Sequence, residues 1–167
     1  MVKAIWAQST NDVIGQNGKL PWHIPSELKH FKNETLGKTV VVGRKTYESI
    51  PNNLPGRQVI VLTKNKAFVP DADNVHVAHN KFDVHIINRE LKDAGKTDGE
   101  VIIAGGASIY ELFTDEIDEY VVTVVNKQIE GEGLEYLPSG LLDKYQSLIS
   151  KHSYDIDDHS EYFIVRA

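Results

Sequence analysis

The sequence predicts a single α/β domain over residues 1–167, built on a mainly parallel central sheet of about eight strands with helices on both faces and a C-terminal antiparallel hairpin. Short runs of valine and isoleucine alternate along the chain with segments of helical character, which is the pattern of a parallel sheet with crossover helices. Residues 145–166 instead alternate polar and apolar side chains, as the two strands of an edge hairpin do. No repeat, linker or low-complexity tract divides the chain.

Each predicted element follows from its local sequence. Strands are expected at 2–8, 39–43, 58–63, 74–79, 100–106 and 119–125. The runs at 39–43 and 58–63 are largely unbroken and apolar, which is typical of strands covered on both faces. Helices are expected at 25–35, from about Arg44 onward, from about 80 to 95, and at 107–113. Pro25 suits the first position of a helix, and Asn80 and Gly95 suit the start and the end of the third helix.

The segment 9–24 is predicted to be a loop with a function. It is long for a connection inside a compact domain, and such loops are commonly binding loops or lids. Glycine and proline interrupt it, while Ile14, Leu20 and Trp22 give it apolar positions. Apolar side chains on a loop hinged at glycines such as Gly15 predict a lid that covers a ligand.

The composition excludes several classes of protein. A net charge of −6 argues against nucleic-acid binding, which needs a basic face. The chain has no cysteine, which excludes disulfides and sulfur-bound metals, and none of its seven histidines has the spacing of metal ligands. No serine lies in a nucleophile-elbow motif, and the N-terminal apolar run is too short for a signal peptide or a membrane helix. We therefore expect a cytoplasmic protein that binds no metal, no nucleic acid and no membrane.

Three of the predicted strands end in sequences that suit phosphate binding. These sequences are Gly43, Arg44, Lys45 and Thr46; Thr63 and Lys64; and Gly105 and Gly106 before the helix that begins at Ala107. Ligands of open α/β sheets bind beyond the carboxyl ends of the strands, where backbone N–H groups, hydroxyls and cations can hold an anion. Each turn alone fits an ordinary strand-to-helix connection, and neither G-x-G-x-x-G nor a P-loop is present. Their combination favours a ligand with several phosphates.

Two charged residues are candidate ligand-binding groups. Glu27 falls at the edge of the helical stripe that carries Leu28 and Phe31, near the positive N-terminus of the predicted helix. A carboxylate there either reaches to water or grips a polar heterocycle inside an apolar pocket. Arg57 follows the rigid turn 54–56, where it is either a solvated charge or a fork that binds a carboxylate. The residues themselves leave both alternatives open.

Taken together, these motifs resemble those of the dihydrofolate reductase family. The matching segments span almost the whole chain: "IG" at 14–15, "LPW" at 20–22, a helix with Glu27 and Phe31, "VGRKTYESI" at 42–50, "LPGR" at 54–57, "IAGGASIYELF" at 103–113, Thr123, and "EGE" at 130–132. Each segment is weak evidence alone, but their order and spacing together are specific. The resemblance implies reduction of 7,8-dihydrofolate to 5,6,7,8-tetrahydrofolate by hydride transfer from NADPH to C6 and protonation of N5, in support of one-carbon and thymidylate metabolism. It also implies a monomer that binds this small-molecule substrate and folate-analogue inhibitors.

The resemblance implies the residues of the site as well. Glu27 matches the family's single active-site acid and is the catalytic candidate. The substrate contacts are expected to be Ile5, Ala7, Leu20, Trp22, Glu27, Leu28, Phe31, Ile50, Leu54, Arg57, Ala104, Tyr110 and Thr123. The cofactor contacts are expected to be Ala7, Ile14, Gly15, Leu20, Gly43, Arg44, Lys45, Thr46, Leu62, Thr63, Lys64, Ala104, Gly105, Gly106, Ala107, Ser108 and Ile109.

Within these sets the resemblance implies individual roles. Glu27, supported by Thr123, would accept hydrogen bonds from the 2-amino group and the adjacent ring N–H of the pteridine. Arg57 would bind the carboxylate of the glutamate tail. A cis peptide between Gly105 and Gly106 would lie below the pyrophosphate of NADPH. The 2′-phosphate of NADPH would be held by Arg44, Thr63 and Lys64.

The chain departs from the family pattern at several places. Its acid is Glu27 where many bacterial members have aspartate, and Leu20 stands where many have methionine in the lid. The segment 130–133 differs, and extra residues precede 137–138, so the sequence does not say which group holds the lid. Two other functions stay open: an NADPH reductase that acts on a ribosylated pyrimidine, and a nucleotide-binding regulator without chemistry. The pairing of Glu27 with Arg57 argues against the first, and the intact acid and lid argue against the second.

Overall fold

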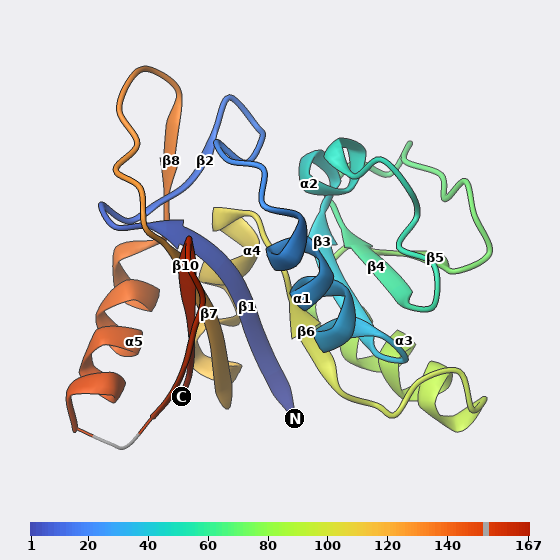
Figure 1. The fold of residues 1–167 in the computed structure, drawn as a ribbon. Helices are drawn as coiled ribbons and strands as arrows, with labels where there is room; N and C mark the ends of the chain where they lie inside the picture. Colours follow the sequence, from blue (N-terminus) through green and yellow to red (C-terminus); the bar gives the residue numbers. More distant parts are fainter. Residues whose placement is uncertain (152–153) are drawn as a thin grey trace.

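The computed structural model describes residues 1–151 and 154–167. Its main feature is one sheet with helices packed against both faces (Figure 1). The strands of this sheet are β1 (Val2–Ser9), β3 (Thr39–Gly43), β4 (Gln58–Leu62), β5 (Val75–Ala78), β6 (Val101–Ile103), β7 (Glu119–Val125), β9 (Asp155–Asp158) and β10 (Tyr162–Arg166). The helices are α1 (Pro25–Thr35), α2 (Arg44–Ser49), α3 (Lys81–Asp93), α4 (Ala107–Phe113), α5 (Ser139–Lys151) and a 3-10 turn at Thr114–Glu116.

The order of the strands across the sheet is β5-β4-β3-β6-β1-β7-β10-β9. All neighbours from β5 to β7 are parallel, whereas β10 runs antiparallel to both β7 and β9. The predicted fold class, a mainly parallel sheet of about eight strands with a C-terminal antiparallel hairpin, is therefore confirmed. Because parallel strands end at the same edge, the segments after β1, β3, β4 and β6 meet there, where ligands of such sheets bind.

Alternate residues of the central strands pack on opposite faces of the sheet. On β1, Trp6 belongs to a core that also contains Val84 of α3 and Leu141 of α5. The next residue along the strand, Ile5, faces the other way and packs in a cluster with Ile24, at the start of α1. The valine- and isoleucine-rich strands are thus covered on both faces, as their composition predicted. The N-terminal turn of α1 lies over the same face as Ile5, which brings this helix to the site described below.

The prediction of a hairpin over the whole tail 145–166 is wrong for residues 145–151, which form the last turns of α5. Tyr145 is buried on the sheet together with Leu141, four residues earlier, and Leu148 and Ile149 pack against the same core. This spacing of three and four residues is helical, and it overrides the apparent alternation. The hairpin itself is present as β9 and β10. Residues 152–153 of the predicted hairpin lie outside the described residues.

The predicted loop 9–24 also contains a short strand, β2 (Val13–Gln16). It pairs antiparallel with β8 (Leu134–Tyr136), and the two form a separate small sheet. A strand of four residues with a partner far along the chain leaves little local signal in the sequence. Figure 1 shows the two strands rising from the end of the main sheet next to β1. In the described ranges, no helix has the length and apolar character needed to cross a membrane.

Candidate functional site

Two adjoining pockets lie where the parallel strands β1, β3, β4 and β6 end. Their volumes are about 720 Å³ and about 810 Å³, the size of small-molecule sites. Residues that line both pockets are Gly18, Thr46, Gly106 and Glu135. Because they share this boundary, a ligand in one pocket can touch a ligand in the other.

The structure places nearly every predicted site residue in one of these pockets. The first pocket is lined by Ile5, Ala7, Ile14, Gly15, Leu20, Trp22, Glu27, Leu28, Phe31, Thr46, Ile50, Leu54, Arg57, Ala104, Gly105, Gly106 and Tyr110. The second is lined by Gly43, Arg44, Lys45, Thr46, Leu62, Thr63, Lys64, Gly106, Ala107, Ser108 and Ile109. Thr123 lies behind the first pocket, buried in β7. The pockets do not separate the predicted substrate and cofactor residues completely, since Ile14, Gly15 and Gly105, which were predicted as cofactor contacts, line the first pocket. The roles of all these residues stay predictions.

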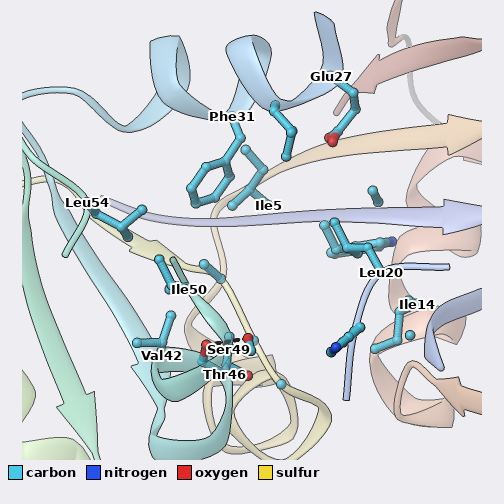
Figure 2. A pocket seen from close by; sticks show the side chains of 18 of the residues that line it. Ile5, Ile14, Leu20, Glu27, Phe31, Val42, Thr46, Ser49, Ile50 and Leu54 are labelled. Atoms are coloured by element: carbon cyan, nitrogen blue, oxygen red, sulfur yellow. Dashed lines mark hydrogen bonds between the residues drawn. The ribbon is translucent and has the colours of Figure 1, made fainter. Parts of the chain in front are cut away.

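The first pocket has apolar walls and a carboxylate at one side. In Figure 2, Glu27 and Phe31 extend from α1 above β1. Ile50 lies across the pocket from Phe31. Leu20 and Ile14, from the predicted lid, stand at the end of the pocket opposite to Leu54. The arrangement suits a flat ring held between apolar side chains, with one polar edge turned toward Glu27.

Glu27 is a buried carboxylate in the first turn of α1, with 7% of its surface exposed. The helix begins at Pro25, and the Glu27 N–H donates to the carbonyl oxygen of Ile24 at 3.0 Å. Burial raises the pKa of Glu27 because it removes water from the charged form, and a hydrogen bond with the Thr123 hydroxyl acts in the opposite direction. In the described chain no cation forms an ion pair with Glu27. The Glu27 side chain therefore does not project into bulk solvent but lies at the pocket.

Arg57 is a buried guanidinium, with 5% of its surface exposed. Its Nη1 donates to Thr35 Oγ1 at 3.1 Å, and its Nε donates to the Pro55 carbonyl oxygen at 3.2 Å. Both acceptors are neutral, burial lowers the pKa of Arg57, and no carboxylate pairs with it within 1–151 and 154–167. A buried cation without a counter-ion is costly, and its remaining N–H groups can meet an incoming carboxylate. The alternative of a solvated turn charge is therefore wrong.

The second pocket contains the cations predicted to hold a phosphate. Arg44 Nη1 donates to the two carboxylate oxygens of Glu48 at 3.0 and 3.1 Å, one helical turn away on α2. Such a partly exposed pair contributes only about 0–1 kcal/mol, so Arg44 can turn toward a ligand anion at little cost. Lys64 is exposed directly after β4, beside Thr63. Two cations and a hydroxyl thus surround one side of this pocket.

Glycine backbone forms the boundary between the two pockets. The peptide bond between Gly105 and Gly106 is cis, as the resemblance implied. The Gly43 N–H donates to the Gly105 carbonyl oxygen at 2.9 Å, which ties the end of β3 to this turn. Gly105 has φ +113°, and a Cβ atom there would lie 3.3 Å from the ring of Tyr110, whose hydroxyl donates to the Ile5 carbonyl oxygen at 2.6 Å. This close packing leaves a surface without side chains that a ligand's pyrophosphate can approach.

Comparison with known proteins agrees with this geometry. The family model described as dihydrofolate reductase matches residues 1–166. The chain belongs to the dihydrofolate reductase family. A dihydrofolate reductase of Lactococcus lactis is 32% identical over 163 residues, which are 97% of this chain and 92% of the relative. One from Staphylococcus aureus is 36% identical over 126 residues, which are 75% of this chain and 72% of the relative.

A solved structure shows the same fold. Dihydrofolate reductase from Enterococcus faecalis, complexed with NADP(H) and RAB-propyl, aligns with a TM-score of 0.71 and 29% sequence identity. The alignment covers 99% of this chain and 94% of that chain. The predicted family and enzyme class, dihydrofolate reductase, are therefore confirmed.

The sequence left open which segment contacts the predicted lid, and in the structure residues 132–136 do so. The Asn17 N–H donates to the Gly133 carbonyl oxygen at 2.9 Å. The next N–H, that of Gly18, donates to Glu135 Oε1 at 3.2 Å. In this member of the dihydrofolate reductase family, the altered segment thus still contacts the lid, and a side chain of β8 takes part.

Several pocket residues were not found from the sequence. In the first pocket they are Trp6, Gly18, Lys19, His23, Ile24, Lys32, Val42, Ser49, Pro51, Asn52 and Glu135. In the second they include His79, Asn80, Lys81 and Leu112. Val42 and Ser49 stand inside the matched motif 42–50, so the motif could have indicated them. His79 follows β5 and Glu135 is on β8, and no local pattern predicts where those elements lie.

Proposed function

We propose that the protein catalyses the NADPH-dependent reduction of 7,8-dihydrofolate to 5,6,7,8-tetrahydrofolate, in support of one-carbon and thymidylate metabolism. The observation that carries this proposal is the burial of Glu27 and Arg57, two charges without an ionic partner in the described chain, in the lining of one apolar pocket. Dihydrofolate has groups that complement both, a hydrogen-bond donor edge on its pteridine ring and a carboxylate on its tail. Membership in the family supports the same reaction.

Glu27 binds the pteridine in this proposal. An ionised carboxylate accepts two hydrogen bonds side by side, which matches the 2-amino group and the neighbouring ring N–H. The Thr123 hydroxyl lowers the pKa of this carboxyl and so favours the ionised form. Phe31 and Ile50 pack on the ring, and folate-analogue inhibitors that present the same pair of donors would bind in the same way.

The second pocket fits NADPH by its donor set. Arg44 and Lys64 supply positive charge for the 2′-phosphate, and the exposed backbone of Gly105 and Gly106 suits the pyrophosphate. When bound, NADPH supplies the hydride that C6 of the pteridine accepts. The boundary shared by the two pockets, at Thr46 and Gly106, is where the two ligands would meet.

The proton that N5 needs does not come directly from Glu27 in this proposal, because Glu27 grips another edge of the ring. A water molecule delivers it, while the negative charge of Glu27 favours protonation of the ring. Trp22 Nε1 is a buried donor in the pocket lining without an acceptor among the residues described, so it is available to such a water or to the substrate. The apolar side chains of Leu20 and Ile14 on the lid exclude bulk water.

One assay tests the proposal. Purified protein is mixed with NADPH, and the loss of NADPH absorbance is followed with dihydrofolate, with a ribosylated pyrimidine or with no second substrate. We expect oxidation of NADPH with dihydrofolate alone, and formation of tetrahydrofolate in equal amount. Oxidation with the pyrimidine in place of dihydrofolate would assign the protein to the other reductase class. Binding of NADPH without any oxidation would indicate a regulator.

A further inference from the structure

The segment 50–57, between α2 and β4, forms one wall of the first pocket and consists of turns and bends. Its pocket-lining residues are Ile50, Pro51, Asn52, Leu54 and Arg57. Leu54 has φ +48°, a left-handed conformation that residues other than glycine rarely adopt, and its side chain is buried against the sheet (Figure 2). A backbone in this conformation is maintained only when contacts from the surrounding structure hold it.

The contacts that hold the segment come from Asn74, directly before β5. Its side-chain Nδ2 lies 2.6 Å from the carbonyl oxygen of Asn53, 3.3 Å from that of Leu54 and 3.0 Å from that of Arg57. The backbone of Asn74 is itself fixed to the sheet, because its carbonyl oxygen accepts the Val59 N–H at 2.8 Å. The two hydrogens of one amide group are thus shared among three carbonyl groups of the segment, and they tie it to the residue that pairs with β4.

A second contact holds the same turn from the side of α2. The Tyr47 hydroxyl lies 2.5 Å from Asp71 Oδ1 and 2.8 Å from Asn53 Oδ1. Its ring is buried and packs edge-on against Phe68, with ring centres 5.9 Å apart. Burial and the neighbouring Asp71 carboxylate raise the pKa of Tyr47 to about 12, so the hydroxyl keeps its proton at neutral pH. Because the hydroxyl has one proton, it donates to one of these two oxygens at a time, and it keeps contact with the turn that Asn74 also binds.

We infer that Asn74 is a positioning residue for Arg57 and thereby sets the enzyme's affinity for the carboxylate tail of its substrate. Tyr47, whose hydroxyl contacts both Asp71 and Asn53, acts with it at the same turn. All of these side chains lie outside the residues that line the two pockets. The inference rests on the proposed function, since it names the groups that hold the tail-binding arginine in place.

The effect is specific to the tail because of where the contacts fall. Asn74 binds the carbonyl of Arg57 itself, whose guanidinium is fixed from the other side by Thr35. Glu27 is on α1 and receives its support from Thr123, so the pteridine end of the pocket does not depend on Asn74. Loss of Asn74 should therefore weaken binding of the tail and leave the reacting ring in place.

The decisive variant is Asn74→Asp, which keeps the shape but replaces the donor by a carboxylate that faces three carbonyl oxygens. We expect the KM for dihydrofolate to rise by about tenfold, which corresponds to one or two lost hydrogen bonds. At saturating dihydrofolate, kcat should stay within about twofold of the parent value, as expected for loss of binding alone. The KM for a dihydropterin without the glutamate tail, and the KM for NADPH, should stay unchanged.

The chain offers a matched control in Asn88→Asp. Asn88 Nδ2 donates to the Gly99 carbonyl oxygen at 3.0 Å, so this variant makes the same chemical change at a turn outside the lining of both pockets. Its KM for dihydrofolate should equal that of the parent. Tyr47→Phe removes one hydroxyl from a buried ring and serves where Asn74→Asp folds poorly. It should raise the KM for dihydrofolate in the same direction, by a smaller factor.

Amide hydrogen exchange separates the failure of this inference from the failure of the proposed function. The Arg57 N–H donates to the Leu54 carbonyl oxygen at 3.2 Å, and its exchange should become faster in Asn74→Asp but not in Asn88→Asp, whether or not the protein reduces dihydrofolate. If the parent is inactive with dihydrofolate, the proposed function fails while the exchange still reports the positioning. An unchanged KM for dihydrofolate in Asn74→Asp would overturn the inference. So would an equal rise for the tailless substrate or in Asn88→Asp.

Discussion

The Thr123 side chain of β7 acts on the carboxyl group of Glu27 on α1, because its hydroxyl lowers the pKa that burial raises. Thr123 is 1% exposed, and in the parallel pairing of the two strands it stands beside Ala7 of β1. A group of the sheet thus acts on an acid that the helix supplies. A hydroxyl donor near the carboxylate favours the ionised form of Glu27, against the effect of burial.

This relationship predicts a shift in the pH dependence of the reaction. Thr123→Val keeps the shape and removes the hydroxyl, so the pKa of Glu27 should rise further above its ordinary value. The pH profile of kcat/KM for dihydrofolate should move to higher pH, because the ionised form binds the pteridine. Thr39→Val is the control, since Thr39 is also buried on the sheet and its hydroxyl has no partner in the described chain. A Thr123→Val profile that coincides with that of Thr39→Val would contradict the prediction.

Removal of the charge at Glu27 should slow hydride transfer. Glu27→Gln places an amide donor opposite a donor of the pteridine and removes the negative charge that favours protonation of the ring. We expect a loss of at least about a hundredfold at neutral pH, the lower end of general acid–base contributions. The residual rate should increase as the pH falls, because substrate that is protonated in solution needs less help.

Two measurements accompany this rate. NADPH binding by Glu27→Gln, followed by fluorescence, should match that of the parent and show that the fold is intact. Glu27→Asp keeps the charge and should retain far more activity than Glu27→Gln. A Glu27→Gln protein with the parental rate and pH profile would show that Glu27 is not the active-site acid.

Arg57 should determine binding of the substrate tail. Arg57→Ala removes the guanidinium group that would bind the carboxylate. It should raise the KM for dihydrofolate by about tenfold or more, because hydrogen bonds between charged groups contribute about 1.5–3 kcal/mol. Arg57→Lys keeps the charge but not the paired geometry and should recover only part of the loss. Steady-state kinetics with a tailless dihydropterin provides the comparison. An equal loss for both substrates would mean that Arg57 serves only the packing around Thr35.

Cofactor choice should depend on the cations of the second pocket. NADPH carries one phosphate more than NADH, and we expect its kcat/KM to be higher by about tenfold or more, as charge-assisted hydrogen bonds allow. Lys64→Ala and Arg44→Ala should each reduce that preference. Lys66→Ala changes an exposed lysine outside the pocket lining and should not. Equal kcat/KM for the two cofactors in the parent would contradict the assignment.

The parts of the fold that the sequence predicted are those with local signals. Continuous apolar runs indicated the parallel strands, and Asn80 and Gly95 indicated the limits of α3, where Asn80 Oδ1 accepts the Asp83 N–H at 2.8 Å. The strand β2 was missed because it is short and its partner strand, β8, lies far away in the sequence. Local alternation was also misleading at the start of the tail, where Tyr145 packs with Leu141 as part of a helix.

The residues of the candidate site also differ in whether local sequence signals could predict them. The matched motifs indicated Glu27 and Arg57, but only the structure shows that both are buried, because burial depends on how distant elements close the pocket. Side chains that act from outside the pocket left no signal at all. Asn74 is an ordinary polar residue before a strand, and its contact with the segment 50–57 exists only because β5 lies next to β4. Long-range contacts of this kind set the site and cannot be derived from spacing.

Burial of Glu27 also predicts a gain of stability when its charge is removed. Its pKa is raised in the folded protein, so folding favours the protonated form. The protonated carboxyl contributes its full stabilisation of the folded protein below the ordinary glutamate pKa of about 4.3. This contribution to the free energy of unfolding is lost as the pH rises through the raised pKa of Glu27. At neutral pH the folded protein therefore buries an ionised Glu27, and this charge would have a lower free energy in the unfolded chain, where water surrounds it.

Glu27→Gln has no such charge, so we expect it to unfold at higher urea concentration than the parent at pH 7, with a gain of about 0.5–2 kcal/mol, as is common when a functional residue is replaced. The difference should shrink as the pH falls from the raised pKa of Glu27 toward the ordinary value, where the parent becomes protonated as well. Glu130→Gln makes the same substitution at an exposed position and should change stability little at either pH. If Glu27→Gln were less stable than the parent at pH 7, the hydrogen bond from Thr123 would outweigh the effect of burial, and the carboxylate would belong to the scaffold as well as to the site.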